Sequence, residues 1–214
     1  MQTRIWLMRH AETATPHLFH GAESDIGLSE LGVAQAKAAA EVYAQFRPDV
    51  IVSSGMLRAR LTAAPIVEMC QVPYEIELDL HERKVGALSG TPNDATGGVW
   101  PETLQRWVRG ELDYAPAGSE SFEAIRSRVV PAFERVATRH AGKSVVIVAH
   151  GIVCRVLLLS ILEGWSPEDW TKLGRIPNMA VSELIHWAGT WQAVRTNEVF
   201  PEVAALSAMP DRRS

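Results

Sequence analysis

Two strongly apolar stretches of the sequence each end in a histidine. The stretch IWLMRH delivers Arg9 and His10, and the stretch VVIVAHG delivers His150 and Gly151. Ligands of open parallel sheets bind beyond the carboxyl ends of the strands. If the two strands are neighbours, we therefore expect the two imidazoles to face each other across one crevice.

Cations gather at the same predicted rim. The segment SSGMLRARLTA follows another apolar run and opens a helix, which puts Arg58 near the first helical turn. Arginine offers planar paired donors that match phosphate oxygens, and the helix that starts after His150 offers free N–H groups. Arg9, Arg58 and the two strand-end histidines therefore predict a binding site for a phosphoryl group.

His10 has the features of a nucleophile. A neutral imidazole with one nitrogen held by a backbone carbonyl presents its other nitrogen for attack, and nearby arginines lower its pKa. Arg9, Arg58 and His150 would then stabilise the transferred phosphoryl group. The leaving oxygen also needs a proton. The candidate donor is Glu82 in LHERKVGALSG, because partial burial in such a loop can raise the pKa of a carboxyl group.

Bulk composition narrows the functional classes. The 214 residues are 47% apolar and carry a formal net charge of -4, which predicts one domain and gives no bulk attraction to nucleic acid or acidic membranes. The first residues lack a secretory pattern, and no apolar run reaches the roughly 20 residues that span a bilayer. We therefore expect a cytoplasmic protein in which Cys70 and Cys154 are buried, reduced thiols.

Strand and helix signals alternate along the chain, which favours a layered α/β fold. Core strands, whose continuous apolar character indicates a sheet covered on both faces, are expected at residues 4–8, 49–53, 74–78 and 144–150. An edge hairpin is expected from two further strands, 181–187 and 191–199, that turn at 188–190. Helices are expected at residues 29–46, 56–70, 119–142 and 151–164.

The remaining segments complete a single domain over residues 1–200. Residues 90–117 are rich in Gly, Pro and Trp and include a short helix signal, and we expect them to cap one end of the sheet. Trp100 and Trp107 in this segment are candidates for the wall of an apolar pocket mouth. Residues 201–214 are expected to be a loosely held C-terminal tail.

At these residues the sequence resembles the histidine phosphatase superfamily, which includes the cofactor-dependent phosphoglycerate mutases and many small-molecule phosphatases. Five segments are similar to family motifs and occur in the family's order: RHAET, SSGMLRARLTA, LHERKVGALSG, PAGSESF and VVIVAHG. The resemblance implies that Arg9 and Arg58 bind phosphate and that His10 carries the phosphoryl group. It makes Glu82 the acid and base, and His150 the second histidine of the catalytic pocket.

The resemblance also implies a fold and a substrate class. The expected fold is a three-layer α/β/α sandwich with a mostly parallel central sheet, and no metal or other cofactor is implied. Many members carry an asparagine six residues after the nucleophilic histidine, where this chain has Pro16, and a nearby threonine is the expected substitute. The following loop, TPHLFHG, departs from the family pattern. The candidate substrate-binding residues are Thr13, Thr15, His20, Gly21 and Gly151.

These features predict a phosphomonoesterase that hydrolyses a small phosphorylated metabolite through a phosphohistidine intermediate. The region after Glu82 is shorter than the insertion that the mutases carry there, which favours hydrolysis. Two alternatives stay open: a mutase that returns the phosphoryl group to a substrate hydroxyl, and a catalytically weak scaffold that binds phosphate. The identity of the phosphate ester and a homodimer are also left open.

Overall fold

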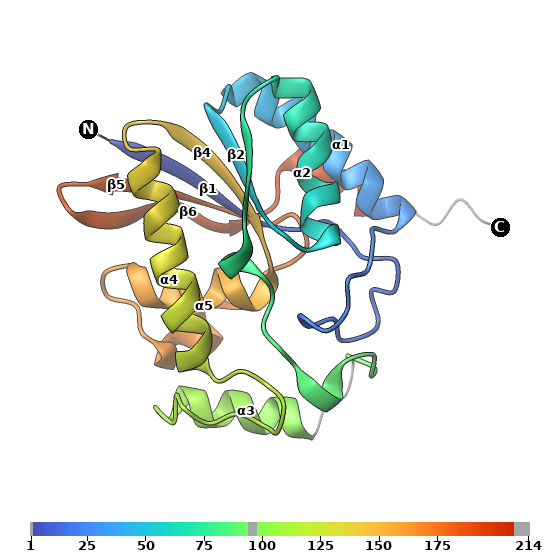
Figure 1. Cartoon of the computed structure of the whole chain (residues 1–214), viewed down its shortest axis with the longest axis vertical. Helices are drawn as coiled ribbons and strands as arrows, with labels where there is room; N and C mark the ends of the chain where they lie inside the picture. The colour runs from blue at the N-terminus through green and yellow to red at the C-terminus, as the bar shows by residue number, and fades with distance from the viewer. Residues whose placement is uncertain (1, 94–97, 208–214) are drawn as a thin grey trace.

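A computed structural model describes residues 2–93 and 98–207, and in them six strands form one sheet in the order β3-β2-β4-β1-β5-β6 (Figure 1). The strands are β1 (Thr3–Arg9), β2 (Val50–Ser54), β3 (Tyr74–Glu77), β4 (Ser144–Ala149), β5 (Val181–Trp187) and β6 (Thr190–Glu198). The first four run parallel to one another, whereas β5 pairs antiparallel with β1, and β6 pairs antiparallel with β5. The predicted, mostly parallel sheet is confirmed.

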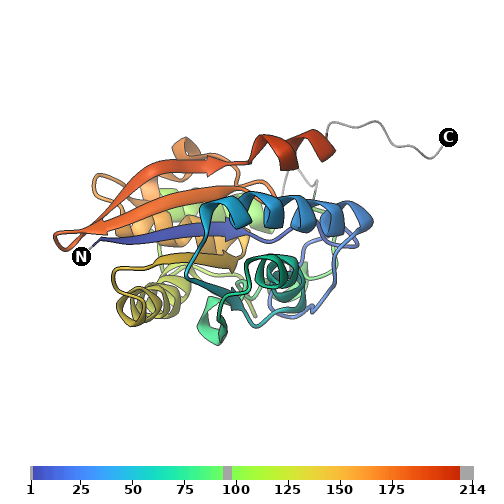
Figure 2. The ribbon, with the colours of Figure 1, turned by 90° about the horizontal axis from the view of Figure 1, so that it is seen from above.

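Helices cover both faces of the sheet. They are α1 (Glu30–Phe46), α2 (Leu57–Cys70), α3 (Val99–Val108), α4 (Phe122–Arg139), α5 (Gly151–Ile161), α6 (Trp170–Leu173) and α7 (Pro201–Ser207). Side chains alternate between the two faces of a strand. Helices α4 and α5 lie on one face, and α1, α2 and α7 lie on the other (Figures 1 and 2). Ile5 and Leu7 of β1 accordingly pack in the first layer, whereas Trp6 and Met8 pack in the second. The predicted three-layer α/β/α sandwich is confirmed.

The register between β1 and β4 places two functional segments side by side. Arg9 is the partner of Ala149 in the parallel pair, and the N–H of His10 donates to the carbonyl of Ala149 at 2.9 Å. His10 and His150 therefore leave neighbouring strands at the same edge of the sheet. This confirms that the two strands that end in histidine are neighbours, on which the predicted crevice depends.

The N-terminus of α1 fixes the loop that follows β1. Ser29 caps the helix by accepting the N–H of Gly32 at 2.9 Å, as its position predicts, and also donates to Glu12 Oε1 at 2.7 Å. A Cβ atom at Gly32 would lie only 2.1 Å from the carbonyl oxygen of Glu12. The glycine therefore allows α1 to approach the segment that carries His10.

Most element boundaries agree with the sequence. Each predicted strand end lies within one residue of the observed end, and Ala188 and Gly189 turn the edge hairpin with φ of 53° and 88°. The helix expected at 119–142 is shorter because Ser121 is its N-cap.

Cys154 is a buried free thiol, as predicted, but Cys70 is only half-buried. No helix in the part of the chain that the structure describes has the length and apolar character needed to cross a membrane.

The prediction of a loosely held tail is wrong for residues 201–207. These residues form α7, which lies beside α1 (Figure 2). The Val203 side chain is 1% exposed and packs in the apolar layer around Tyr43. The short apolar face of α7 is sufficient to attach it because α1 presents a matching face. The rest of the predicted tail, 208–214, lies outside the described residues.

Candidate active site

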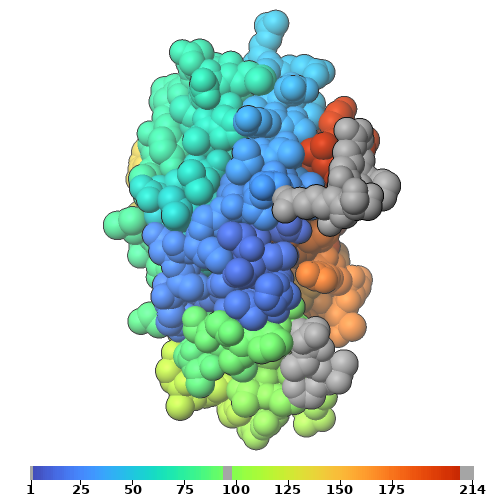
Figure 3. All heavy atoms as spheres, turned by 90° about the vertical axis from the view of Figure 1, so that its right-hand side faces the viewer, coloured from blue at the N-terminus to red at the C-terminus, as the bar shows by residue number. Residues whose placement is uncertain are grey.

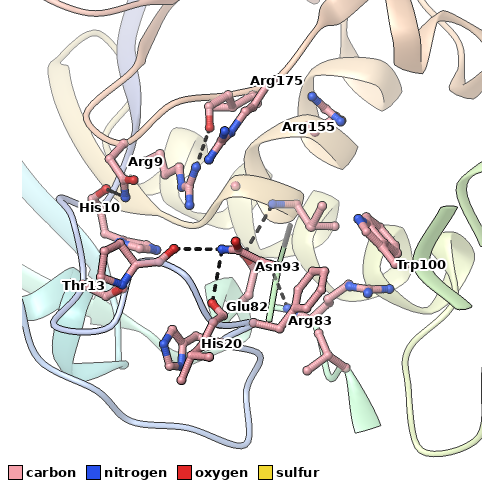
Figure 4. A pocket seen from close by; sticks show the side chains of 18 of the residues that line it. Arg9, His10, Thr13, His20, Glu82, Arg83, Asn93, Trp100, Arg155 and Arg175 are labelled. Carbon is pink, nitrogen blue, oxygen red and sulfur yellow. Dashed lines mark hydrogen bonds between the residues drawn. The ribbon is translucent and has the colours of Figure 1, made fainter. Parts of the chain in front are cut away.

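A cavity of about 600 Å³ opens at the carboxyl end of the parallel strands (Figure 4). Its wall combines the end of β1, the loop after it, the loop after β3, the segment before and within α3, the start of α5 and the loop before β5. In the space-filling view, the blue surface of the segment after β1 meets the green surface of the segment before α3 (Figure 3). Backbone hydrogen bonds of Phe19 with Gly90 and Thr91 join these two segments.

His10 lies in the cavity wall in the protonation state that a nucleophile requires. Its Nδ1 is 2.7 Å from the carbonyl oxygen of Ala11, and because a carbonyl oxygen only accepts, Nδ1 carries the proton. The lone pair is then on Nε2. Burial, followed by the charges of Arg58 and Arg9, lowers the pKa of His10 well below its usual value. The structure therefore favours a neutral imidazole whose Nε2 has no hydrogen-bond partner among the described residues.

His150 lies against His10 but is fully buried, and its ring is not part of the cavity wall. The two ring centroids are 5.2 Å apart, and Nε2 of His150 is 2.8 Å from Ser54 Oγ. Burial and then the charge of Arg58 lower the pKa of His150 well below its usual value. Its Nδ1 has no hydrogen-bond partner in the described part of the chain. A direct contact of His150 with a phosphoryl group stays a prediction.

The neutrality of the two histidines predicts their titration. Since burial and neighbouring arginines lower both pKa values, protonation requires a pH well below the usual value of about 6.5. We expect the ring NMR signals of His10 and His150, assigned with the His10→Ala and His150→Ala variants, to stay at neutral shifts as the pH falls from about 8 to about 5.5. The same chain in denaturant, which should titrate normally, is the control. A midpoint near 6.5 in the folded protein would contradict this electrostatic picture.

Two arginines with different surroundings accompany the histidines. Arg9 lines the cavity, donates to the carbonyl of Ile176 at 2.6 Å, and has its pKa lowered to about 10 by burial. Arg58 is fully buried behind the wall. Its guanidinium donates to three backbone carbonyls of the loop after β1, those of His20, Gly21 and Ser24. Arg58 therefore holds this loop in place, in addition to the charge that it supplies near His10.

The predicted substrate-binding residues divide into two groups. Thr13, His20 and Gly151 line the cavity, whereas Thr15 and Gly21 do not. Thr15 supports the wall indirectly, since its Oγ1 is 2.8 Å from Nε2 of His20. Gly21 has a steric role, because a Cβ atom there would lie 2.6 Å from a side-chain carbon of the loop after β3. Of the two threonines proposed to replace the family asparagine, the structure places Thr13 in the wall.

Glu82 is 7% exposed and lies in the cavity wall across from Thr13 (Figure 4). One carboxylate oxygen accepts the N–H of Arg83 at 2.9 Å, and the other accepts the N–H of Ile152 at 3.4 Å in the first turn of α5. The loop that carries Glu82 is held from behind by Arg128 of α4. The Arg128 guanidinium donates to the carbonyls of Asp79, His81 and Glu82 at 2.7, 2.8 and 3.3 Å.

Arg128 is therefore expected to position Glu82 without touching a substrate. It is fixed by an ion pair with Glu120, at 2.8 Å, whose other oxygen accepts the N–H of Lys84. We expect Arg128→Met to lower kcat by about 10- to 100-fold with little change in KM, because a small displacement of a proton donor is costly. The control is Arg126→Met, which removes an exposed ion pair on the same helix. Wild-type kcat in Arg128→Met would show that the loop positions Glu82 by itself.

Several cavity residues were not predicted as site residues. They are Arg83, Asn93, Arg155, Arg175 and Asn178. Arg155 lies one helical turn after Gly151, so the helical period could have identified it. Asn178 had no local signal, yet its side-chain amide donates to the carbonyls of His10 and Ala11 at 3.0 and 3.1 Å. Of the two tryptophans proposed for the pocket mouth, Trp100 lines the cavity. The prediction for Trp107 is wrong, because its ring is fully buried in the core.

No group of three or more His, Cys, Asp or Glu side chains in the described ranges is arranged to hold a metal ion. The family model of the histidine phosphatase superfamily (branch 1) matches residues 5–199. The chain belongs to this superfamily. This membership covers all the segments that build the cavity wall.

Relatives within the histidine phosphatase superfamily differ in their activities. A metal-independent phosphoserine phosphatase of Arabidopsis thaliana is 37% identical over 86% of this chain and 76% of that protein. A 2,3-bisphosphoglycerate-dependent phosphoglycerate mutase of Methylobacterium radiotolerans is 32% identical over 77% of this chain and 81% of that protein. The solved structure of a mycobacterial glucosyl-3-phosphoglycerate phosphatase is 27% identical, with a TM-score of 0.78 over 92% of this chain and 99% of that one.

Proposed function

We propose that this histidine phosphatase superfamily member hydrolyses small phosphate monoesters through a phosphohistidine at His10. The observation that carries the proposal is the geometry of His10. Its neutral ring has the proton fixed on Nδ1 by the Ala11 carbonyl, which leaves Nε2 as the nucleophile in a wall shared with Arg9. A phosphatase related at 37% identity supports the hydrolytic outcome.

In the first step, Nε2 of His10 attacks phosphorus, so an N–P bond forms while the bond from phosphorus to the ester oxygen breaks. The carboxylic acid form of Glu82 gives its proton to the leaving oxygen, which departs as an alcohol. In the second step, Glu82 takes a proton from water as the water oxygen attacks phosphorus. The N–P bond breaks, inorganic phosphate forms, and both His10 and Glu82 return to their initial states.

The surroundings of His10 supply stabilisation for the transferred group. Arg58 and Arg9 are the arginines whose charges act on His10. The N-terminal end of α5, whose first residues Gly151 and Ile152 line the cavity, points its positive dipole end there. Such donors stabilise the equatorial oxygens of a phosphoryl group in the transition state. We assign His150 the same role through its Nδ1, which has no other hydrogen-bond partner in the described residues.

Phosphoryl transfer to a substrate hydroxyl is the second candidate, because a relative at 32% identity is a phosphoglycerate mutase. One assay separates the two. The purified chain is incubated with phosphoserine, 3-phosphoglycerate and aliphatic phosphate monoesters, and both phosphate release and isomerisation are followed, with and without a bisphosphorylated primer. We expect release to exceed isomerisation for every ester. Isomerisation that is faster than release would identify a mutase, and the absence of both would favour the scaffold.

Two expectations from the sequence stay predictions. Action in the cytoplasm would be tested by fractionation of cells that express the tagged chain. A homodimer would be tested by sedimentation of the purified protein over a range of concentrations.

A further inference from the structure

The half of the cavity opposite His10 carries a second group of cations. Arg83, Arg155 and Arg175 all line the cavity, and Figure 4 shows Arg83 across the cavity from His10 and Arg155 above it. Arg83 is only 2% exposed. Its Nη1 and the Nε of Arg155 are buried and have no hydrogen-bond partner in the described part of the chain. A buried guanidinium N–H without a partner lowers the stability of the folded protein, which indicates that a ligand accepts hydrogen bonds from these groups.

Two of these arginines lie over tryptophan rings. The Cζ atom of Arg83 lies 3.8 Å from the ring centroid of Trp100, and that of Arg155 lies 4.5 Å from the ring centroid of Trp170. The two indoles themselves meet edge to face, with centroids 6.3 Å apart. Stacking covers one face of each planar guanidinium and leaves its N–H edges available. The two tryptophans therefore orient the N–H groups of Arg83 and Arg155 before a ligand binds.

The wall carries more arginines than carboxylates, although the charges of Glu82, Glu120 and Glu23 act on Arg83. In the described residues, the wall contains Glu12 and Glu82 against four arginines. Glu12 accepts from Ser29, and Glu82 is the proposed acid of the reaction. Burial, first of all, lowers the pKa of both Arg83 and Arg155 to about 10, and for Arg155 the charge of Arg9 adds to the effect. Both groups therefore remain charged at neutral pH, and the cavity has cations beyond those assigned to the transferred phosphate.

We propose that Arg83 and Arg155, with Arg175 at the exposed rim, form a second anion subsite that binds a carboxylate or a second phosphoryl group of the substrate. The inference rests on the proposed function, which assigns the first anion site to the transferred phosphate, and it narrows the substrate to esters that carry another anion. A guanidinium edge matches both kinds of oxyanion with paired hydrogen bonds.

Matched pairs of ligands test the subsite on the wild-type protein. 3-Phosphoglycerate and glycerol 3-phosphate differ in a carboxylate against a hydroxymethyl group. Propane-1,3-diol bisphosphate and 3-hydroxypropyl phosphate differ in a second phosphoryl group. Both Kd, measured by calorimetry on the His10→Ala protein, and kcat/KM of the wild type are compared within each pair. A hydrogen bond to a charged group corresponds to about a 10- to 100-fold difference in Kd. In at least one pair, we expect the member with the second anionic group to be favoured by that factor.

Variants assign the preference to the proposed residues. Arg155→Met should remove most of the preference for the member with the second anion. It should lower the value for that member by a larger factor than the value for the member that lacks the second anion, because the guanidinium contacts the second anion. Arg155→Lys keeps the positive charge but lacks the paired N–H donors of the guanidinium, so its preference for the second anion should be intermediate. This variant provides the test if Arg155→Met does not fold. The matched control is Arg60→Met on the exposed side of α2, which should retain the wild-type preference.

The outcomes separate this proposal from the proposed function. Equal Kd and kcat/KM within both pairs would overturn the subsite while hydrolysis itself stands. An equal loss for both members of a pair in folded Arg155→Met and Arg155→Lys would also overturn it. Tighter binding of the charged members by the His10→Ala protein, with no ester hydrolysed by the wild type, would support the subsite and reject the phosphatase.

Discussion

The His10→Ala variant is expected to lose at least about 10⁴-fold in kcat/KM for its best phosphate ester, because no other imidazole among the described wall residues has a ring nitrogen without a hydrogen-bond partner. His10 is the imidazole that lines the cavity with its proton fixed on Nδ1 by a carbonyl and its pKa lowered by burial and by Arg58. His20 also lines the cavity, but both of its ring nitrogens lie within hydrogen-bond distance of Thr15 or Ser24. The measurement is the rate of phosphate release at saturating and at limiting concentrations of the ester.

A matched control for this variant lies in the same loop. His17 is exposed and is not part of the cavity wall, so His17→Ala should retain kcat/KM within about twofold, as surface substitutions usually do. Circular dichroism of the His10→Ala protein should match the wild type, because the ring makes one local hydrogen bond. A folded His10→Ala protein with more than about a tenth of the wild-type activity would exclude His10 as the nucleophile.

Glu82→Gln should have the second large effect, and the effect should depend on the leaving group. Glutamine keeps the side-chain volume but provides no acidic proton. We expect kcat/KM for alkyl phosphates to fall by about 10²- to 10⁴-fold, the range typical of general acid catalysis. For p-nitrophenyl phosphate, whose leaving group needs no proton, the first step should remain fast. The second step still lacks its base, so a burst of nitrophenol followed by slow turnover is expected.

The Glu82→Gln experiment has its own control and contradiction. Glu163 is exposed just after α5, and Glu163→Gln should leave both substrates unaffected. Full activity of Glu82→Gln on alkyl phosphates would remove Glu82 from the mechanism. An equal loss on both substrates without a burst would instead indicate that Glu82 acts by holding the first turn of α5 through Ile152.

The sequence predicts the reacting half of the site because that half depends on local patterns. Apolar strands that end in Arg9–His10 and in His150 need only parallel neighbours to bring their ends together, and the β1–β4 register provides this. Ser29 likewise signals the start of α1 through its own side chain. These features rest on periodicity and capping, which act over a few residues.

The opposite half of the site could not be predicted because it depends on contacts between distant segments. Arg83 becomes a cavity residue only when α3 brings Trp100 beneath its guanidinium, and Arg155 only when Trp170 of α6 packs against α5. The prediction for Trp107 was wrong for the same reason, since the burial of its ring depends on contacts with Phe122 and Trp170. Composition predicts a cap at one end of the sheet, but it does not predict which tryptophan faces the cavity.

The loop that departs from the family pattern shows a third case. Its sequence, TPHLFHG, gave no recognisable element, yet the structure organises it around Arg58, whose guanidinium donates to the carbonyls of His20, Gly21 and Ser24. Arg58 was predicted from a motif, but its use as a support for the loop was not. The loop is therefore connected to the reacting group through a residue that also lowers the pKa of His10.

The central claim is that the phosphoryl group is bound covalently to His10 before water removes it. The most direct measurement is rapid quenching of the wild-type protein in alkali during turnover, followed by mass spectrometry of the peptide that contains His10. We predict one phosphoryl group on His10, lost on acid treatment, absent from His10→Ala, and hydrolysed at least as fast as kcat. Continued release of phosphate with no phosphorylated His10 peptide, or with the phosphoryl group on another residue, would contradict the account.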